Sequence, residues 1–206
     1  MKIWTAGPAA LLVELDGIEQ VQALHAELLA RCADGRLPAV AEIVPAARTV
    51  LLDGVADPGA IGAEIVTWRL GPIAGTDAGR LVEIPTRYDG EDLPWVAQQW
   101  GVGVEQVVAI HAGTEVRAAF CGFAPGFAYL VGLAERYHLP RRATPRASVP
   151  AGAVALAGEF TGVYPRASPG GWHLIGHTDL PMWDPSRSEP ALVTPGTRVR
   201  FVPVGP

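Results

Sequence analysis

From Ala118 to its last residue the chain is a succession of short β-type runs separated by glycine and proline. The clearest runs lie at 153–157, 172–175 and 197–202. Glycine and proline suit the tight turns between strands and are unfavourable inside helices. Many short strands with frequent turns are typical of a β-barrel or a β-sandwich. The sequence therefore predicts one of these two folds for the C-terminal part.

The N-terminal part has a different pattern, in which strands and helices alternate. A short buried strand is predicted at 10–15, and two β-type runs at 39–44 and 48–52 are close enough to form a hairpin. Apolar residues at helical spacing predict a helix at 17–31, and Asp57 followed by Pro58 is typical of the start of another. The apolar residues that would line these helices are Ile18, Val21, Leu24, Leu28 and Leu29 in the first, and Ile61, Ile65, Trp68 and Leu70 in the second.

The order β-α-β-β-α in this part would become a split βαβ, ferredoxin-like unit if the β-rich run 80–88 paired back with it. The stretch 71–79 lacks periodicity and is predicted to be a linker. Two short helices are expected after it, at 93–100 with Asp92 as N-cap and at 104–111 with Gly113 as the stop. The predicted class is α+β, with domains at 1–79 and 80–206.

Composition excludes several classes of function. The chain is 49% hydrophobic and 18% charged, which suffices for a packed core. Its formal net charge of −5 gives no electrostatic reason to expect nucleic acid or an anionic membrane as a partner. No apolar run is long enough for a signal peptide or a membrane helix, and Cys32 and Cys121 alone make no disulfide framework. A cytoplasmic protein is predicted.

The common catalytic and metal-binding motifs are missing from the sequence. It contains no G-x-x-x-x-G-K-[ST] phosphate loop, no H-E-x-x-H pair and no G-x-S-x-G nucleophile elbow. His173 and His177 are four residues apart, but in a segment predicted as strand and turn that spacing creates no shared ligand geometry. No metal site is predicted, and His111 is kept as a candidate at the end of a predicted helix.

The segment 120–130 packs aromatic residues between glycines and a proline. Glycine allows close approach of the backbone to a ligand, and aromatic rings supply flat apolar walls. Phe123, Pro125, Phe127 and Tyr129 are therefore candidates for a pocket wall. The alternative is a tight turn with a small core of its own.

The segment 140–150 holds three arginines, Arg141, Arg142 and Arg146, between three prolines. Proline limits the backbone freedom of the segment, and a guanidinium group can bind two oxygens of a carboxylate or phosphate. The three arginines are candidates for substrate or phosphate binding. The alternative is a solvated loop whose arginines pair with nearby acidic residues.

The segment 162–176 is predicted to place a turn between two aromatic residues. Ser168, Gly170 and Gly171 belong to that turn, which could present backbone N–H groups to an anion. Tyr164 and Trp172 would flank it as further pocket wall. A barrel turn with packed aromatics is the alternative. The sequence places no base beside Ser168 as a nucleophile, so the catalytic residues stay unassigned.

Taken together and in this order, the motifs resemble the KipI/PxpB family, which is also described as allophanate hydrolase subunit 1. The resemblance extends over nearly the whole chain and is most specific in the three loops. The matching motifs are ALLVE at 10–14, VPAAR at 44–48, IPTRYDG at 84–90, HAGT at 111–114, GFAPGF at 122–127, PRRATPR at 140–146, VPAG at 149–152, TGVYP at 161–165 and SPGGW at 168–172.

This resemblance implies a ferredoxin-like N-terminal domain and a cyclophilin-like C-terminal β-barrel. It also implies a KipA/PxpC-type partner and a LamB/YcsF-type partner, with which such proteins open the lactam 5-oxoproline to L-glutamate. ATP, with Mg²⁺, would be a co-substrate of that complex, and no cofactor or metal is expected to reside in this chain. Two alternatives stay open: inhibition of a sensor histidine kinase, and a subunit role in a urea or allophanate amidohydrolase system. Prolyl isomerisation would rest on the fold alone, which does not carry function.

Three departures from the family pattern are visible. Ala128 stands where proline is common, Glu159-Phe160 replaces a small or polar pair, and His177 replaces a common arginine. Because histidine lacks the permanent charge of arginine, the last change bears on any anion-binding role at that position.

Overall fold

The computed structural model describes residues 1–71 and 80–205. The chain divides into two compact units, Met1–Ala78 and Gly79–Pro206, and each is described by itself. The predicted linker at 71–79 and the predicted domain boundary fall, apart from Gly71, outside the described residues. No helix in the described part of the chain is long and apolar enough to cross a membrane.

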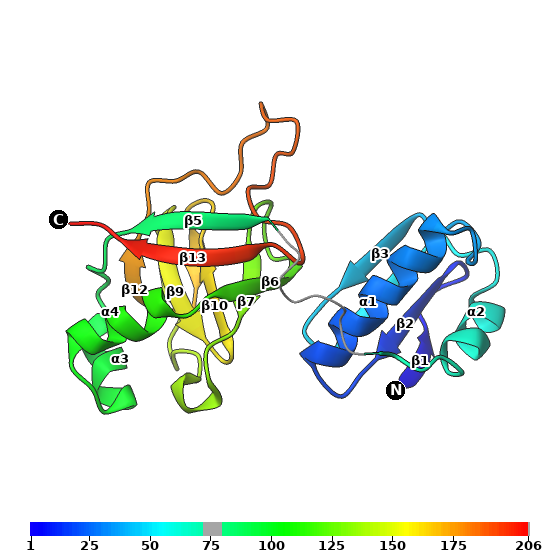
Figure 1. The fold of residues 1–206 in the computed structure, drawn as a ribbon, viewed down its shortest axis with the longest axis horizontal. Helices are drawn as coiled ribbons and strands as arrows, with labels where there is room; N and C mark the ends of the chain where they lie inside the picture. The colour runs from blue at the N-terminus through cyan, green and yellow to red at the C-terminus, as the bar shows by residue number, and fades with distance from the viewer. Residues whose placement is uncertain (72–79, 206) are drawn as a thin grey trace. The chain divides into compact units, whose positions relative to one another are not determined.

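The first unit packs two helices on one face of a four-stranded sheet (Figure 1). All neighbouring strands are antiparallel, in the order β1-β2-β4-β3. β2 and β3 therefore run parallel with β4 between them, which is the split βαβ arrangement of a ferredoxin-like unit. The elements are β1 (Lys2–Thr5), β2 (Ala10–Glu14), α1 (Ile18–Ala33), β3 (Glu42–Pro45), β4 (Thr49–Asp53) and α2 (Pro58–Ile65).

Two predicted details of this unit are confirmed. The Asp57 side chain accepts a hydrogen bond from the Ala60 backbone N–H at 2.9 Å, so α2 has its predicted N-cap. The predicted hairpin closes where the Ala46 N–H donates to the Thr49 carbonyl at 2.8 Å. α2 ends earlier than its apolar spacing predicts, although Trp68 and Leu70 still pack against the same core.

The run 80–88, whose pairing the sequence leaves open, does not pair back with this unit. The edge of the sheet is occupied instead by β1, the four-residue strand that the sequence analysis missed. β1 is mostly exposed, so it lacks the buried alternation that identifies a strand in sequence, and its pairing with β2 defines it. The predicted strand exists as β5 (Leu81–Thr86), but it pairs in parallel with the last strand of the second unit.

The second unit is a nearly closed barrel built on a seven-stranded sheet, as the predicted fold class requires. The strand order is β12-β9-β10-β7-β6-β13-β5. Its strands are β5, β6 (Val116–Cys121), β7 (Ala128–Val131), β9 (Ala153–Ala157), β10 (Phe160–Val163), β12 (His173–His177) and β13 (Arg198–Pro203). Two short strands, β8 (Arg146–Val149) and β11 (Ser168–Gly170), pair beside it, and Glu135–Tyr137 form a 3₁₀ turn.

Two helices, α3 (Leu93–Trp100) and α4 (Val104–Gly113), follow β5 and pack at one end of the barrel (Figure 1). Both correspond to predicted helices. The segment between β12 and β13 extends away from the opposite side of the sheet as a long loop. The core of the unit is apolar and is formed mainly by the strands and by one face of each helix.

A single backbone bridge joins the two edge strands of the barrel. The Arg87 N–H donates to the His177 carbonyl at 2.9 Å, and the His177 N–H donates back to Arg87 at 2.8 Å. A Cβ atom on Gly176 would collide with the Arg87 carbonyl, and one on Gly90 would collide with the backbone of β12. The barrel can close here because neither position carries a side chain.

We expect Gly176→Ala to destabilise the second unit by about 1–3 kcal/mol, because backbone atoms must move to admit the methyl group. Gly103→Ala is the matched control, since its Cβ would meet nothing within 4 Å. Urea unfolding of both variants measures the difference. Equal free energies of unfolding would show that the bridge at Arg87 does not constrain the barrel.

Candidate functional site

The Asp92 carboxylate is the centre of the most connected polar cluster in the second unit. Its Oδ1 accepts a hydrogen bond from Arg142 Nη1 at 2.6 Å, and its Oδ2 accepts one from Arg146 Nη1 at 2.9 Å. Oδ2 also accepts the Leu174 backbone N–H of β12 at 2.7 Å. One carboxylate therefore joins the start of α3, a barrel strand and the arginine-rich loop.

The charges around Asp92 outweigh its burial. Burial alone raises the pKa of this carboxyl group, but the hydrogen bonds from Arg146 and Leu174 and the charges of Arg146 and Arg142 bring its pKa below the ordinary value. Asp92 is therefore ionised at neutral pH although only 6% of its surface is exposed. It occupies the N-cap position of α3 as predicted, but its side chain makes no cap hydrogen bond because both oxygens are engaged elsewhere.

The three predicted arginines have different environments. Arg142 and Arg146 are paired with Asp92, and Arg146 also contacts Glu91 at 3.0 Å, which matches the ion-pair alternative for this loop. Arg141 lies on the surface, and its guanidinium has no hydrogen bond or ion pair with any residue that the structure describes. Binding of substrate or phosphate by these arginines stays a prediction.

Several contacts fix the arginine-rich loop against the barrel. The Arg142 N–H donates to the Gly171 carbonyl at 2.8 Å, and His173 Nε2–H donates to the Pro140 carbonyl at 2.9 Å. The His173 ring stacks on Trp95 of α3 with a centroid distance of 4.1 Å. The loop that carries Arg141 is therefore held from the barrel side and from the helix side.

Two buried polar atoms near this loop are left without a partner. Arg142 Nε, which is a donor, and His173 Nδ1, which is an acceptor when Nε2 carries the proton, have no hydrogen bond among the described residues. Buried polar atoms are rarely left unpaired.

The predicted turn at Ser168 is wrong. Ser168–Gly170 is strand β11, which pairs antiparallel with β8 through Ser168↔Val149 and Gly170↔Arg146. A two-stranded edge ladder tolerates the proline at position 169, which makes the segment look like a turn in sequence. Ser168 itself is buried, and its hydroxyl lies 3.4 Å from the Arg166 carbonyl. Gly170 and Gly171 lie next to Tyr164 and to the arginine-rich loop, respectively.

The predicted wall residues form one aromatic cluster. Phe127 is at its centre and makes edge-to-face contacts with rings at centroid distances between 5.0 and 5.4 Å. The ring partners of Phe127 are Phe123, Tyr129, Tyr164 and Trp172. Phe160 extends the cluster at 5.4 Å from Tyr129, so this departure from the family pattern adds a ring to the wall.

Phe123 differs from the other rings of the cluster. It is the one described non-glycine residue with positive φ, at 69°, and 59% of its surface is exposed. The left-handed conformation is unfavourable for an aromatic residue. Pro125 beside it is also exposed. The loop thus presents an aromatic ring outward on a strained backbone.

Arg141 acts electrostatically on two phenol groups of this wall. Burial raises the pKa of Tyr129 and of Tyr164, and the positive charge of Arg141 opposes both changes. The arginine-rich loop lies beside this cluster, because Arg146 pairs with Gly170 and the Gly170 backbone lies against the Tyr164 ring. The loops predicted separately at 120–130, 140–150 and 162–176 thus meet at one surface of the barrel.

His111, the predicted helix-end candidate, lies inside the barrel and is fully buried. The Thr161 hydroxyl donates to the Ala155 carbonyl, so it accepts from His111 Nε2–H at 3.0 Å, and the Tyr88 O–H donates to Nδ1 at 2.8 Å. Burial lowers the pKa of His111 to about 3. A neutral ring with both nitrogens paired is a structural core residue.

The other histidines of the barrel unit are also engaged. His138 Nε2–H donates to the Leu133 carbonyl, and His177 accepts from Arg87 Nε at 3.0 Å and donates from Nδ1 to Asp89 at 2.8 Å. Within residues 1–71 and 80–205, no group of three or more His, Cys, Asp or Glu side chains could hold a metal ion.

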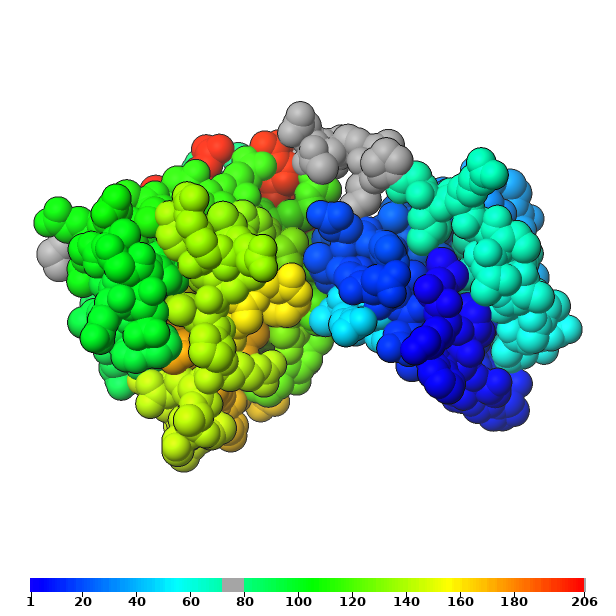
Figure 2. All heavy atoms as spheres, turned by 90° about the horizontal axis from the view of Figure 1, so that it is seen from below, coloured from blue at the N-terminus to red at the C-terminus, as the bar shows by residue number. Residues whose placement is uncertain are grey.

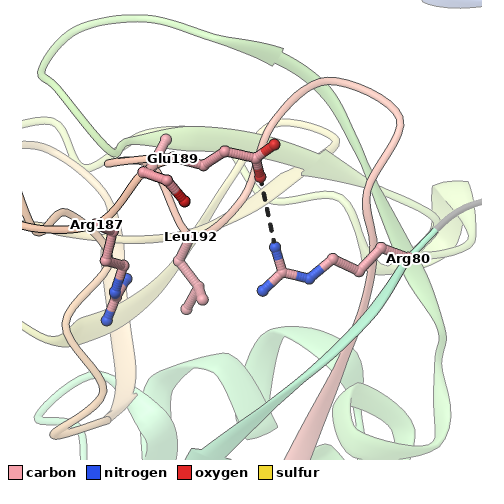
Figure 3. Close-up of a pocket in the computed structure, with 6 residues that line it drawn as sticks. Arg80, Arg187, Glu189 and Leu192 are labelled. Carbon is pink, nitrogen blue, oxygen red and sulfur yellow. Dashed lines mark ion pairs between the residues drawn. The ribbon is translucent and has the colours of Figure 1, made fainter.

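An open groove of about 430 Å³ lies elsewhere on the barrel unit, beside the start of β5 (Figure 3). Arg80 extends into it from one side and Arg187 from the other, with Leu192 between them, and Arg80 forms a long ion pair of 3.9 Å with Glu189. None of the residues predicted for binding lines this groove.

The combination of a ferredoxin-like unit and this barrel matches a known family over most of the sequence. The family described as carboxyltransferase domain, subdomain C and D, matches residues 1–193. The chain belongs to this family.

Curated relatives support the predicted KipI/PxpB membership, which is confirmed. The chain is 54% identical over 127 residues to a protein of Escherichia coli O157:H7 that is named as a 5-oxoprolinase subunit, covering 60% of the chain and 58% of that protein. It is 46% identical over 126 residues to the protein of the same name in Bacillus subtilis strain 168, covering 60% of this chain and 52% of that protein. The matches thus span little more than half the length of these relatives.

Solved structures show the same fold. The protein TTHA0988 superimposes with a TM-score of 0.78 at 36% identity, over 96% of this chain and 40% of that one. The urea amidolyase of K. lactis matches with a TM-score of 0.75 at 18% identity, over 98% of this chain and 15% of that one. At this identity the second match shows the fold alone.

We expect Asp92→Asn to lower the free energy of unfolding by about 3–5 kcal/mol, because it leaves two partly buried guanidinium groups without a counter-charge. Asp179→Asn is the control: its carboxylate pairs with Arg87 at 2.6 Å but is 84% exposed, and surface pairs contribute less than about 1 kcal/mol. Chemical denaturation measures both changes. A loss no greater than that of the control would show that Asp92 does not hold the cluster together.

The buried ring of His111 predicts acid sensitivity. Its pKa is about 3 in the folded protein and 6.5 in a solvated chain, so between these values the unfolded state binds the additional proton. The contribution of His111 to the free energy of unfolding is fully present above about pH 6.5. It is lost as the pH falls towards 3, by up to about 1.4 kcal/mol per pH unit. His111→Gln removes this contribution, so urea unfolding from pH 7 to 4 should depend less on pH. An unchanged slope would contradict the prediction.

Proposed function

We propose that this chain is a subunit of an ATP-dependent 5-oxoprolinase, a complex that opens 5-oxo-L-proline to L-glutamate. Support comes from the family match and from relatives that are named as subunits of 5-oxoprolinase. The observation that carries the proposal is the aromatic cluster with the arginine-rich loop, which includes the exposed Arg141, packed beside it. An apolar surface with an unpaired cation suits a small, flat anionic substrate.

The chemistry explains why ATP is needed. The lactam carbonyl is a poor electrophile, and transfer of the γ-phosphoryl group to its oxygen turns that oxygen into part of a leaving group. Water then adds to the carbon, and the C–N bond breaks as the nitrogen takes a proton, which leaves an acyl phosphate. A second water hydrolyses this acyl phosphate, so the products are glutamate, ADP and phosphate. A site for these steps needs cations for phosphate or carboxylate oxygens and an environment that excludes water.

The three arginines would have two different roles in such a site. Arg141 would contact the anionic group directly, because its guanidinium is exposed and unpaired among the described residues. Arg142 and Arg146 would position the loop, because Asp92 already occupies part of their hydrogen-bonding capacity. Phe123, which is exposed, and Tyr129, which is half-buried, would form the wall against which the five-membered ring packs, with the buried rings of Phe127, Tyr164 and Trp172 behind them.

Companion subunits would complete this site. The chain has no phosphate loop, so a nucleotide would need another subunit to bind its phosphates. TTHA0988 carries the fold of this chain within 40% of its length, which is the arrangement expected if a companion region is fused to it there. We assign the companions to the KipA/PxpC and LamB/YcsF types, with ATP and Mg²⁺ as co-substrates of the whole complex.

The test of this function is 5-oxoproline-dependent ADP release by the chain purified with its companion subunits, each omitted in turn. We expect release to require this chain. Urea-dependent release instead would favour the amidohydrolase alternative, and suppression of kinase autophosphorylation by the chain alone would favour the inhibitor alternative. Full 5-oxoprolinase activity without this chain would refute the proposal.

Within the active complex, Arg141→Ala is expected to lower kcat/KM for 5-oxoproline at least about tenfold, since a charged hydrogen bond contributes about 1.5–3 kcal/mol. Arg69→Ala, which removes an exposed arginine of the first unit, is the control. Steady-state ADP release measures both. If both variants assemble normally into the complex and have equal kcat/KM, the proposed role of Arg141 is wrong.

A further inference from the structure

The sheet of the first unit has one face that no helix of this unit covers. Alternate strand residues such as Leu11, Val13, Val50 and Leu52 point toward α1 and α2 and form the core with them. The residues between them point the other way. Figure 2 shows the N-terminal strands and α2 side by side at the surface of this unit.

The register of the strands aligns four apolar residues in a row across this outer face. Trp4 lies opposite Leu12, Leu12 opposite Leu51, and Leu51 opposite Val44, so the row crosses all four strands. Trp4 is 52% exposed and Val44 is 38% exposed, while the two leucines between them are half-buried. Trp4 Nε1–H donates to Glu14 at 3.0 Å, which restrains the indole ring. The row thus forms an apolar strip across the outer face of the sheet, with its two ends exposed.

The rows on either side of it are polar and mainly acidic. One flank contains Glu14 with Lys2 opposite it, and the other contains Glu42 directly opposite Asp53. Neither Glu42 nor Asp53 has an ion pair with a described residue, and both are exposed. Like charges directly opposite on one face repel each other. A cation placed between them would relieve that repulsion.

We propose that this outer sheet face binds a companion subunit through an apolar ridge flanked by lysine or arginine residues. The row Trp4–Leu12–Leu51–Val44 packs against the ridge, and the cations of the partner pair with Glu42 and Asp53. A second copy of this chain is a poorer occupant, because it would bring another acidic face to these carboxylates. The inference rests on the proposed function, which requires companion subunits.

The test uses biolayer interferometry to measure how tightly the full chain binds each purified companion subunit. Val44→Lys places a charge in the apolar row and is expected to weaken binding at least about tenfold. Leu29→Lys is the matched control, since Leu29 is a 49% exposed apolar residue of α1, which packs on the opposite face. We expect it to bind like the unmodified chain. Circular dichroism melts establish that both variants are folded.

A second variant separates binding from structure. Glu42→Lys removes the repulsion with Asp53, so it should leave the free chain equally or more stable. It should nevertheless weaken binding several-fold and make binding less sensitive to NaCl.

If the unmodified chain binds no companion subunit, both this inference and the proposed function fail. If it binds and Val44→Lys binds equally well, the inference alone is overturned. If the free chain self-associates and Val44→Lys abolishes this self-association, the face binds a second copy of the chain. That result would also overturn the inference.

Discussion

The buried carboxylate of Asp92 is the interaction on which the organisation of the second unit depends. An ionised group with 6% exposure is costly unless it is fully paired, and here two arginines and a backbone N–H supply that pairing. Because these partners come from the arginine-rich loop and from β12, satisfying one charge fixes three segments that are far apart in sequence. The surface on which Arg141 and the aromatic rings meet is a consequence of this constraint.

Much of the architecture is predictable from the sequence because it depends on local patterns. The helix α1 follows from apolar spacing, α2 follows from the Asp57 cap, and the barrel follows from short strands separated by glycine and proline. The pairing partner of β5 is not predictable in this way. Its alternation is equally compatible with either sheet, and only the long-range parallel ladder with β13 decides.

The candidate site is predictable from the sequence only in part. Sequence alone identifies the three loops, because arginine, aromatic residues and glycine concentrate there, but it cannot show which charges are already paired. Local spacing predicts Asp92 as a helix cap, whereas its pairing with Arg142 and Arg146 depends on residues 50 and 54 positions away. The reverse error occurs at Ser168, where proline and glycine indicate a turn and the structure has an edge strand.

The pairing of Arg142 and Arg146 also bears on how specificity could arise on such a surface. A guanidinium held by a buried carboxylate has little freedom to follow a ligand, whereas the exposed guanidinium of Arg141 has no hydrogen bond or ion pair with a described residue. Fixed neighbours lower the entropy lost when an unpaired cation binds an anion. Since the paired arginines are neutralised by Asp92 and Glu91, few unpaired positive charges remain in the three loops: those of Arg141 and Arg166, which are exposed and have no ion pair with a described residue. This favours a small monoanion with a flat ring over a polyphosphate, and it argues for a nucleotide site on a companion subunit.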